Sequence, residues 1–261
     1  MVPAYALEIR TVQSSAFKIL IEALKELLTD TSIEFDETGM KIVSMDNSHV
    51  VLVHLKLDAS KFEYYSCPNK ITIGVHMLNF YKLIRTINSN DTLTLFIEDG
   101  DRNHMGIKIE NGEKNTKTTF KLNLLDLDNS KISIDPADFN SVITLPSIDF
   151  QKICRDMNNI AEFVEMKNIG NQLILSCKGD FCSQETILSD SDSYNCVSKN
   201  PQSNEIVQGV FNLKYLVLFT KCTNLCNTVE LYLKNDYPLV VQYLVASLGV
   251  VKLAVAPSMN Q

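Results

Sequence analysis

The sequence predicts an α+β fold in which one unit of strands and helices occurs twice. Most of the chain alternates apolar and polar residues over short stretches, which is typical of half-buried strands. Four segments instead carry apolar residues at three-to-four spacing, the pattern of an amphipathic helix. Two stretches of the second half also resemble two stretches of the first half in the same order, which indicates an internal duplication.

The strand pattern is clearest in "TLTLFIE" (92–98) and "TVELYLK" (228–234). The apolar faces of these two strands would hold Leu93, Leu95, Ile97, Val229, Leu231 and Leu233, and the opposite face of the first would hold Thr92, Thr94 and Glu98. We therefore expect sheets to make up most of the fold.

The clearest helical period lies in the first helical segment, where Ser14 or Ser15 is a plausible N-cap. Its apolar stripe is Phe17, Leu20, Ile21, Leu24 and Leu28. The other three helical segments run from about 76 to 88, 149 to 161 and 212 to 224.

The internal repeat appears as a constant offset between similar stretches. Residues 79–97 match 215–233 at an offset of 136, and residues 16–20 match 149–153 at an offset of 133. Between the halves lies a polar stretch with a break at Asp135-Pro136. We therefore expect an N-terminal domain over 1–120, a connecting loop over 121–139 and a C-terminal domain over 140–261.

Composition excludes several classes of protein. The chain has 261 residues, 45% of them hydrophobic, and no run of about 18 apolar residues that would span a membrane. Its first residues lack a signal-peptide pattern, so we expect a soluble protein inside the cell. Seven cysteines without CxxC spacing argue against a disulfide framework and a zinc site, and Cys222 and Cys226 are interpreted as buried thiols. We expect no cofactor and no metal.

Charge is segregated between the helical segments and the rest of the chain. The net charge is −7, yet the helical segments hold eight basic residues against four acidic ones, Glu22, Glu26, Asp149 and Asp156, which leaves 16 basic and 27 acidic residues elsewhere. The basic residues occur in pairs, two in each helical segment, at spacings that return to one helix face: Lys18 and Lys25, Lys82 and Arg85, Lys152 and Arg155, Lys214 and Lys221. Such faces suit contacts with phosphates that do not read sequence, although solvated helix faces are the simpler interpretation for any one helix.

One cysteine admits a catalytic interpretation. Cys154 lies between Lys152 and Arg155 and is a candidate nucleophile, with His49 or His76 as its base. No flanking signature supports this, and Cys154 falls on an apolar stripe with Phe150, Ile153 and Met157. We therefore expect no catalytic residue.

Several stretches together carry a resemblance to a known family. "SMDNSHVVLV", "LLDLD", "ICRD", "YPLVVQY" and the terminal "AVAP" occur in an order and spacing, from about Ile9 to Pro257, that resemble the proliferating cell nuclear antigen (PCNA) family of eukaryotic sliding clamps. The resemblance implies a duplicated DNA-clamp fold, three identical chains in a head-to-tail ring, sheets outside, and four helices per chain lining a hole around double-stranded DNA. It implies no catalysis, and a location in the nucleus or in a viral replication compartment.

The resemblance also assigns sites. The eight basic helix residues would face DNA without sequence specificity. A groove on the front of the ring would dock the short PIP-box motif of DNA polymerase, the clamp loader, flap endonuclease and ligase, with His49 as a hydrogen-bonding wall residue. The matching groove positions are Met45, His49, Val50, Leu52, Ile132, Ile134, Pro238, Ala256 and Pro257. Because Ala254 stands where the family usually has a bulky aromatic residue, we expect docking to be weaker than is typical.

Two alternatives within the same fold stay open, a subunit of a heteromeric checkpoint-type clamp and a monomeric processivity factor. The intact connecting stretch and the "AVAP" tail favour the replication clamp. For ring assembly we expect a strand at 105–110 to pair with a strand at 173–179 of the neighbouring chain. Charged or proline substitution at Ile107 or Ile109 should then give monomers.

Overall fold

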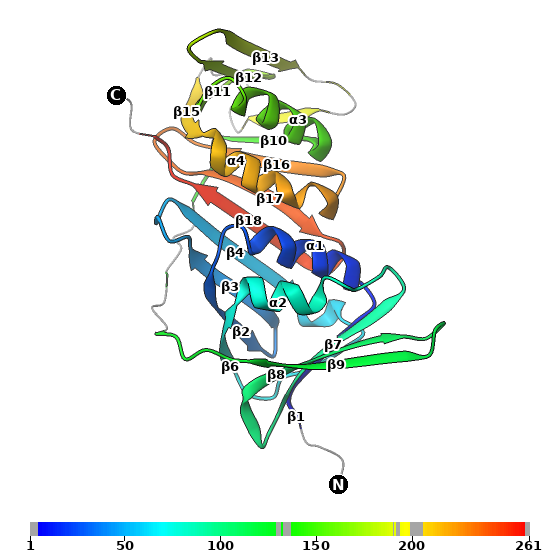
Figure 1. Cartoon of the computed structure of the whole chain (residues 1–261). Helices are drawn as coiled ribbons and strands as arrows, with labels where there is room; N and C mark the ends of the chain where they lie inside the picture. The colour runs from blue at the N-terminus through cyan, green and yellow to red at the C-terminus, as the bar shows by residue number, and fades with distance from the viewer. Residues whose placement is uncertain are drawn as a thin grey trace. The chain divides into compact units, whose positions relative to one another are not determined.

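The computed structural model describes residues 5–128, 132, 137–189, 191, 194–198 and 206–258. Contacts divide these residues into two compact units. The first unit holds 5–47, 53–132 and 244–251, and the second unit holds 48–52, 133–243 and 252–258, within the described ranges. Figure 1 traces the elements along the chain.

The first half of the chain forms nine strands and two α-helices. The strands are β1 (Tyr5–Thr11), β2 (Asp30–Asp36), β3 (Gly39–Met45), β4 (Val51–Asp58), β5 (Tyr64–Ser66), β6 (Ile71–His76), β7 (Asp91–Glu98), β8 (Asp101–Asn111) and β9 (Thr116–Asn123). The helices are α1 (Ser14–Leu24) and α2 (Met77–Ile84), with a 3₁₀ turn, η1, at Ala59–Lys61. Because β9 runs to Asn123, the connecting stretch expected from residue 121 begins as a strand.

The second half repeats this series. Its strands are β10 (Ser141–Pro146), β11 (Phe163–Ile169), β12 (Gln172–Lys178), β13 (Ser183–Ser189), β14 (Asn195–Ser198), β15 (Val207–Asn212), β16 (Thr228–Leu233), β17 (Leu239–Val245) and β18 (Gly249–Val255). Its helices are α3 (Ser147–Asn158) and α4 (Leu213–Phe219), and α4 continues as a 3₁₀ helix, η2 (Thr220–Leu225).

The strand order of the sheets confirms the duplication. The first half contains the orders β5-β1-β7-β8-β9 and β4-β3-β2-β6. The second half contains β14-β10-β16-β17-β18 and β13-β12-β11-β15. Replacing each strand of the first half by the strand nine places later converts one pair of orders into the other, so both halves have the same topology.

An equivalent tertiary contact occurs in each half at the start of its first helix. In the first half the Ser14 hydroxyl donates to the carbonyl of Asp91 at 2.6 Å, and in the second the Ser147 N–H donates to the carbonyl of Asn227 at 2.9 Å. These positions are related by the two offsets seen in the sequence. Neither Ser14 nor Ser15 is the expected N-cap: both lie inside α1, and Gln13 precedes the helix without a side-chain cap hydrogen bond.

Two helices are shorter than their sequence pattern. Helix α2 ends at Ile84, ahead of the expected residue 88, because the backbone turns to bring the Asn88 N–H onto the Asp91 carboxylate at 2.8 Å. Helix α4 changes to 3₁₀ geometry at Thr220, whose hydroxyl donates to the carbonyl of Val217 at 2.8 Å. Hydroxyl groups that bind carbonyls of the preceding turn compete with the helical hydrogen bonds.

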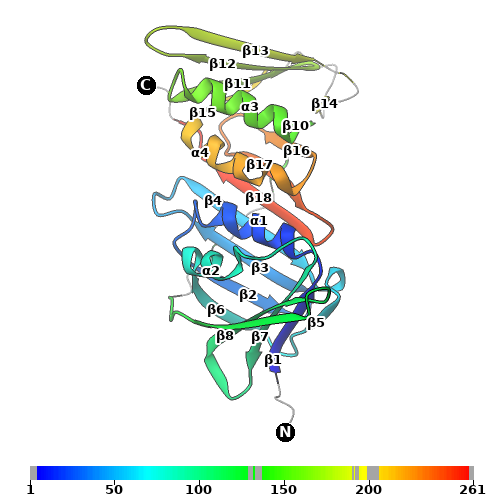
Figure 2. The same cartoon turned by 45° about the vertical axis from the view of Figure 1, so that its right-hand side comes forward.

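The helices pack in pairs, α1 with α2 in the first unit and α3 with α4 in the second; Figures 1 and 2 show each pair side by side over strands of its own half. Phe17 of α1 meets Phe80 of α2 edge to face, with ring centroids 6.2 Å apart. Gln151 of α3 donates to the carbonyl of Thr220 at 2.9 Å. Full burial of each such aromatic ring contributes about 1.5–3 kcal/mol, so packing fixes the helices more than local propensity does.

The alternation of β16 agrees with its prediction, whereas β7 is buried on both faces. Thr94 and Phe96 have exposed fractions of only 1% and 9%. Phe96 lies over Gly106 of β8, where a Cβ atom would stand 2.1 Å from its ring, and it meets Tyr5 edge to face at 5.2 Å. Gly106 therefore leaves space for the Phe96 ring. The alternation of the strand did not predict that this ring would be buried.

The strands expected at the sheet edges are interior strands. Residues 105–110 belong to β8, which pairs with both β7 and β9, and residues 173–178 belong to β12, which pairs with both β11 and β13. Ile107 is fully buried and Ile109 nearly so, so a charge there would disrupt the core. That part of the assembly prediction was wrong, because apolar alternation marks burial and the ends of a sheet are set by pairing.

Candidate nucleic-acid interface and docking surface

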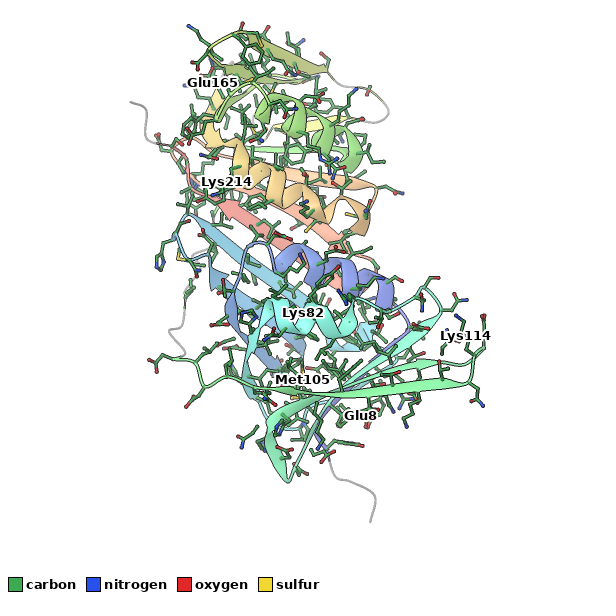
Figure 3. The ribbon with its side chains drawn as sticks, viewed as in Figure 1. Glu8, Lys82, Met105, Lys114, Glu165 and Lys214 are labelled. Carbon is green, nitrogen blue, oxygen red and sulfur yellow. The ribbon has the colours of Figure 1, made fainter. Side chains whose placement is uncertain are left out.

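Six of the eight predicted cations stand exposed on the helices, on the side opposite the buried stripe. In α2 the buried residues are Met77, Phe80 and Ile84, and in α3 they include Phe150, Cys154 and Met157. The exposed cations are Lys82, Arg85, Lys152, Arg155, Lys214 and Lys221. Figure 3 marks Lys82 on α2 and Lys214 on α4.

These six cations form no ion pair with the carboxylates of the described residues. Lys214 lies over the ring of Tyr215, with 5.7 Å between its ammonium and the ring centroid. Cations without a protein counter-ion attract phosphates and release counterions when they bind them. Both units thus offer a helix surface suited to nucleic-acid backbone.

The two cations of α1 differ, because both are engaged within the first unit. The Lys18 ammonium donates to the carbonyl of Ile87 at 2.5 Å, and Lys25 pairs with Glu26 and lies 4.9 Å above the Tyr81 ring. Both side chains are half-buried. The sequence pattern grouped Lys18 and Lys25 with the other six cations. Their tertiary contacts leave less positive charge on α1 available to bind a phosphate.

The segment at residues 48–50 is held by contacts within the second unit. His49 has a φ of 56°, a left-handed conformation that costs a non-glycine residue about 1 kcal/mol. The Ser48 and Tyr215 hydroxyls lie 2.9 Å apart, and the Ala256 N–H donates to the carbonyl of Val50 at 3.0 Å. Helix α4 and the C-terminal tail therefore fix the path of the chain into β4.

The predicted groove residues divide between the two units. His49, Val50, Leu52, Pro238, Ala256 and Pro257 belong to the second unit, and Met45 and Ile132 belong to the first. The Val50–Ala256 hydrogen bond joins two of the predicted segments, and the Ser258 N–H, just beyond Pro257, donates to the carbonyl of Val210 at 2.8 Å. Met45 is 40% exposed, as a docking residue must be. Ile134 lies outside the described residues.

Comparison with known proteins decides the family. The sequence model of the proliferating cell nuclear antigen N-terminal domain matches residues 6–131, and that of the C-terminal domain matches residues 133–258. The chain belongs to the PCNA family. It is also 37% identical over 256 residues to a protein named "Probable DNA polymerase sliding clamp 1" of Paramecium bursaria Chlorella virus 1, covering 97% of each.

The candidate nucleophile of this PCNA-family chain has none of the properties of a reactive thiol. Cys154 is 1% exposed in the core, where burial raises its pKa and keeps the thiol protonated. His76 accepts from the Asn79 N–H at 3.3 Å as the N-cap of α2. In the described ranges no group of three or more His, Cys, Asp or Glu side chains could hold a metal ion, and no helix is long and apolar enough to cross a membrane.

Sequence reasoning missed an aromatic cluster in the second unit of this PCNA-family chain. Phe139 meets Tyr232 and Tyr237 edge to face, with centroid distances of 5.4 and 5.7 Å. The signal was present, since Tyr232 occupies a position of "TVELYLK" that alternation assigns to the polar face, between Glu230 and Lys234. Nothing local indicated that Phe139 and Tyr237 would join it.

Proposed function

We propose that the chain is a DNA sliding clamp, which encircles duplex DNA and holds a polymerase on its template without catalysing a reaction. The observation that carries this proposal is the array of exposed helix cations in both units, which lack protein counter-ions among the described residues. Family membership supports it, as does the name of the viral relative. Contacts to backbone phosphates alone permit sliding, because they carry no sequence information.

The proposed ring contains three identical chains joined head to tail. In the described part of the chain, β9 pairs only with β8 and β13 only with β12, so each presents an unpaired strand edge. Pairing β9 of one chain with β13 of the next would satisfy both edges in a heterologous interface. Exposed Lys117 and Lys121 on β9 are complementary in charge to exposed Glu185 on β13.

Closure of the ring is tested by retention on DNA. The protein is loaded on nicked circular plasmid with a clamp loader and ATP, and gel filtration then separates bound from free protein. A ring held by topology stays on the circle and leaves after a restriction enzyme linearises the DNA. Equal retention on circular and linear DNA would contradict a closed ring. A mass of three chains of 29.4 kDa distinguishes the homotrimer from a monomeric factor.

The proposed docking groove recruits DNA polymerase, the clamp loader, flap endonuclease and ligase in the nucleus or in a viral replication compartment. Its described apolar residues, such as Met45 and Leu52, lie at the end of β3 and near the start of β4. Apolar side chains exposed at a surface are typical of partner sites. The expected ligand is a short segment with Gln, an aliphatic residue and two aromatic anchors.

Calorimetry with a peptide of that composition tests the groove. Leu52→Ala should weaken binding by about 1–2 kcal/mol without changing the mass of the ring, because it shortens an apolar wall. The same loss stays a prediction for Ile134→Ala. No heat of binding at high micromolar peptide, or equal binding to wild type and Leu52→Ala, would count against this groove.

A further inference from the structure

The aromatic cluster of Phe139, Tyr232 and Tyr237 belongs to the second unit and is tied to it by hydrogen bonds. The Tyr232 hydroxyl donates to the Glu230 carboxylate at 2.7 Å, and Gln242 donates to the same oxygen at 2.7 Å. Burial, followed by this carboxylate, raises the pKa of Tyr232 to about 12, so the hydroxyl remains a donor. The ring of Tyr232 is thus held both by its hydroxyl and by an edge-to-face contact with Phe139.

The cluster lies beside proposed groove residues of its own unit. Tyr237 precedes Pro238, and Tyr232 pairs with Val240 of β17. The next strand is β18, whose outward, half-buried positions include Lys252 and Ala254. The sheet order β16-β17-β18 and the position of Lys252 over the Tyr232 ring place the outward face of β18, to which Ala254 belongs, on the same side of the sheet as Tyr232.

Two lysines lie over the faces of these rings. The Lys234 ammonium is 5.3 Å from the Tyr237 centroid, and the Lys252 ammonium is 6.0 Å from the Tyr232 centroid. Neither pairs with a carboxylate of the described residues. A cation held above an aromatic face keeps its charge available to a further anion. The cluster therefore combines an apolar wall with two unneutralised positive charges.

We propose that Tyr232 and Tyr237 form an aromatic wall of the docking groove and that Lys234 and Lys252 select peptides with an acidic residue next to the aromatic anchor. This rests on the proposed docking function. The occupant is a short peptide segment, since two lysine ammoniums above tyrosine rings are complementary to a carboxylate that stands next to an aromatic residue. Rings fixed before binding reduce the ordering cost of docking.

The charge selection is tested with two peptides of the docking type that differ only in one residue next to the aromatic anchors, Glu in one and Gln in the other. At low salt, wild type should bind the Glu peptide about two- to fivefold more tightly, a range typical of exposed ion pairs. In Lys234→Gln/Lys252→Gln this preference should disappear. The matched control, Lys41→Gln/Lys61→Gln, removes two exposed lysines of the first unit and should keep it.

The outcomes separate this inference from the docking function. If wild type binds both peptides equally, or if the Lys234→Gln/Lys252→Gln variant keeps the preference, the lysines do not select and the inference is overturned. If wild type binds neither peptide, the proposed docking function of the groove is contradicted. Tyr232→Leu should weaken both peptides about tenfold, whereas Tyr232→Phe, which keeps the ring, should stay within about threefold of wild type. Equal affinity of the Leu and Phe variants would show that the aromatic ring of Tyr232 does not contribute to the docking site.

Discussion

At the scale of single residues, Tyr215 links helix α4 to the segment at 48–50 of the same unit. Its hydroxyl lies 2.9 Å from the Ser48 hydroxyl, and its ring lies under the Lys214 ammonium. One side chain therefore touches both a helix surface proposed to face DNA and a segment proposed to border the docking groove. The left-handed His49 sits next to this contact, so removing the contact would also release a strained turn.

We expect Tyr215→Phe and Ser48→Ala each to lower docking-peptide affinity about two- to tenfold, and the double variant to lose little more than either single one. A hydrogen bond contributes about 0.5–1.5 kcal/mol, and two partners of one bond are not additive. Calorimetry with the docking peptide measures the affinities of wild type, the two single variants and the double variant. The control is Tyr81→Phe, which removes a hydroxyl bonded to Glu22 in the first unit. Additive losses would mean that the two hydroxyls act separately.

Asp91 gives the first unit a pH dependence. Burial would raise its pKa, but hydrogen bonds from the Asn88 N–H and from the Asn111 and Asn88 amides outweigh burial, and its pKa lies below the ordinary 3.8. Because the folded pKa is depressed, Asp91 stabilises the fold above about pH 4, and this stabilisation is lost as pH falls through the folded pKa.

Asp91→Asn should therefore lower the free energy of unfolding by about 1–3 kcal/mol at pH 7, because the new NH2 group would face at least one N–H donor in place of an accepting oxygen. The difference from wild type should shrink below the ordinary pKa of 3.8. Denaturant unfolding from pH 7 to pH 3 measures it. Asp99→Asn, at an exposed carboxylate of the β7–β8 turn, is the control. A difference that does not vary with pH would contradict the assignment.

At the scale of elements, the helices differ in what they can offer to DNA. The cations of α2, α3, α4 and η2 are exposed, whereas those of α1 bind groups of their own unit. In all four helical segments the two basic residues return to one helix face. The difference in the exposure of their side chains therefore arises from contacts with neighbouring elements. We expect α1 to contribute less to DNA binding than the sequence pattern alone indicates.

Lys82→Glu/Arg85→Glu should weaken clamp-dependent polymerase processivity and reduce the slope of log affinity against log salt by about 2, one unit for each phosphate that the variant no longer neutralises. Lys41→Glu/Lys61→Glu makes the same change in net charge on exposed residues outside the helices that carry the proposed DNA-facing cations and is the matched control. Processivity measured from 50 to 200 mM salt gives both quantities. Equal slopes for the two variants would assign the effect to net charge alone.

At the scale of the whole molecule, assembly depends on strands that lie at sheet edges. Ile187 of β13 is 52% exposed, an unusual position for an isoleucine, and β13 is an edge strand of its sheet. Ile187→Asp should convert the ring to monomers, because it places an unpaired charge in the proposed interface. Light scattering measures the mass. Ile148→Asp, at a 71% exposed isoleucine of α3, should leave the ring intact. A trimeric Ile187→Asp protein would mean that β13 is not the contacting edge.

The sequence by itself determined the features that repeat within a short segment. The period of Phe17, Leu20 and Leu24 placed α1, the alternation of Val229, Leu231 and Leu233 placed β16, and the two offsets revealed the duplication. Such patterns predict burial because side-chain direction follows from local backbone geometry. The motifs that carry the family resemblance are likewise contiguous stretches of the chain.

The tertiary structure decided the features that need partners far apart in the sequence. Only strand pairing placed β9 and β13 at sheet edges, and only packing brought Phe139 against Tyr232 and Tyr237. Likewise, Lys18 has the spacing of a surface cation, yet its ammonium binds a carbonyl 69 residues away. Local periodicity says whether a residue faces the core or solvent; it does not say which distant group occupies the neighbouring space, because that depends on long-range contacts that form only when the chain folds.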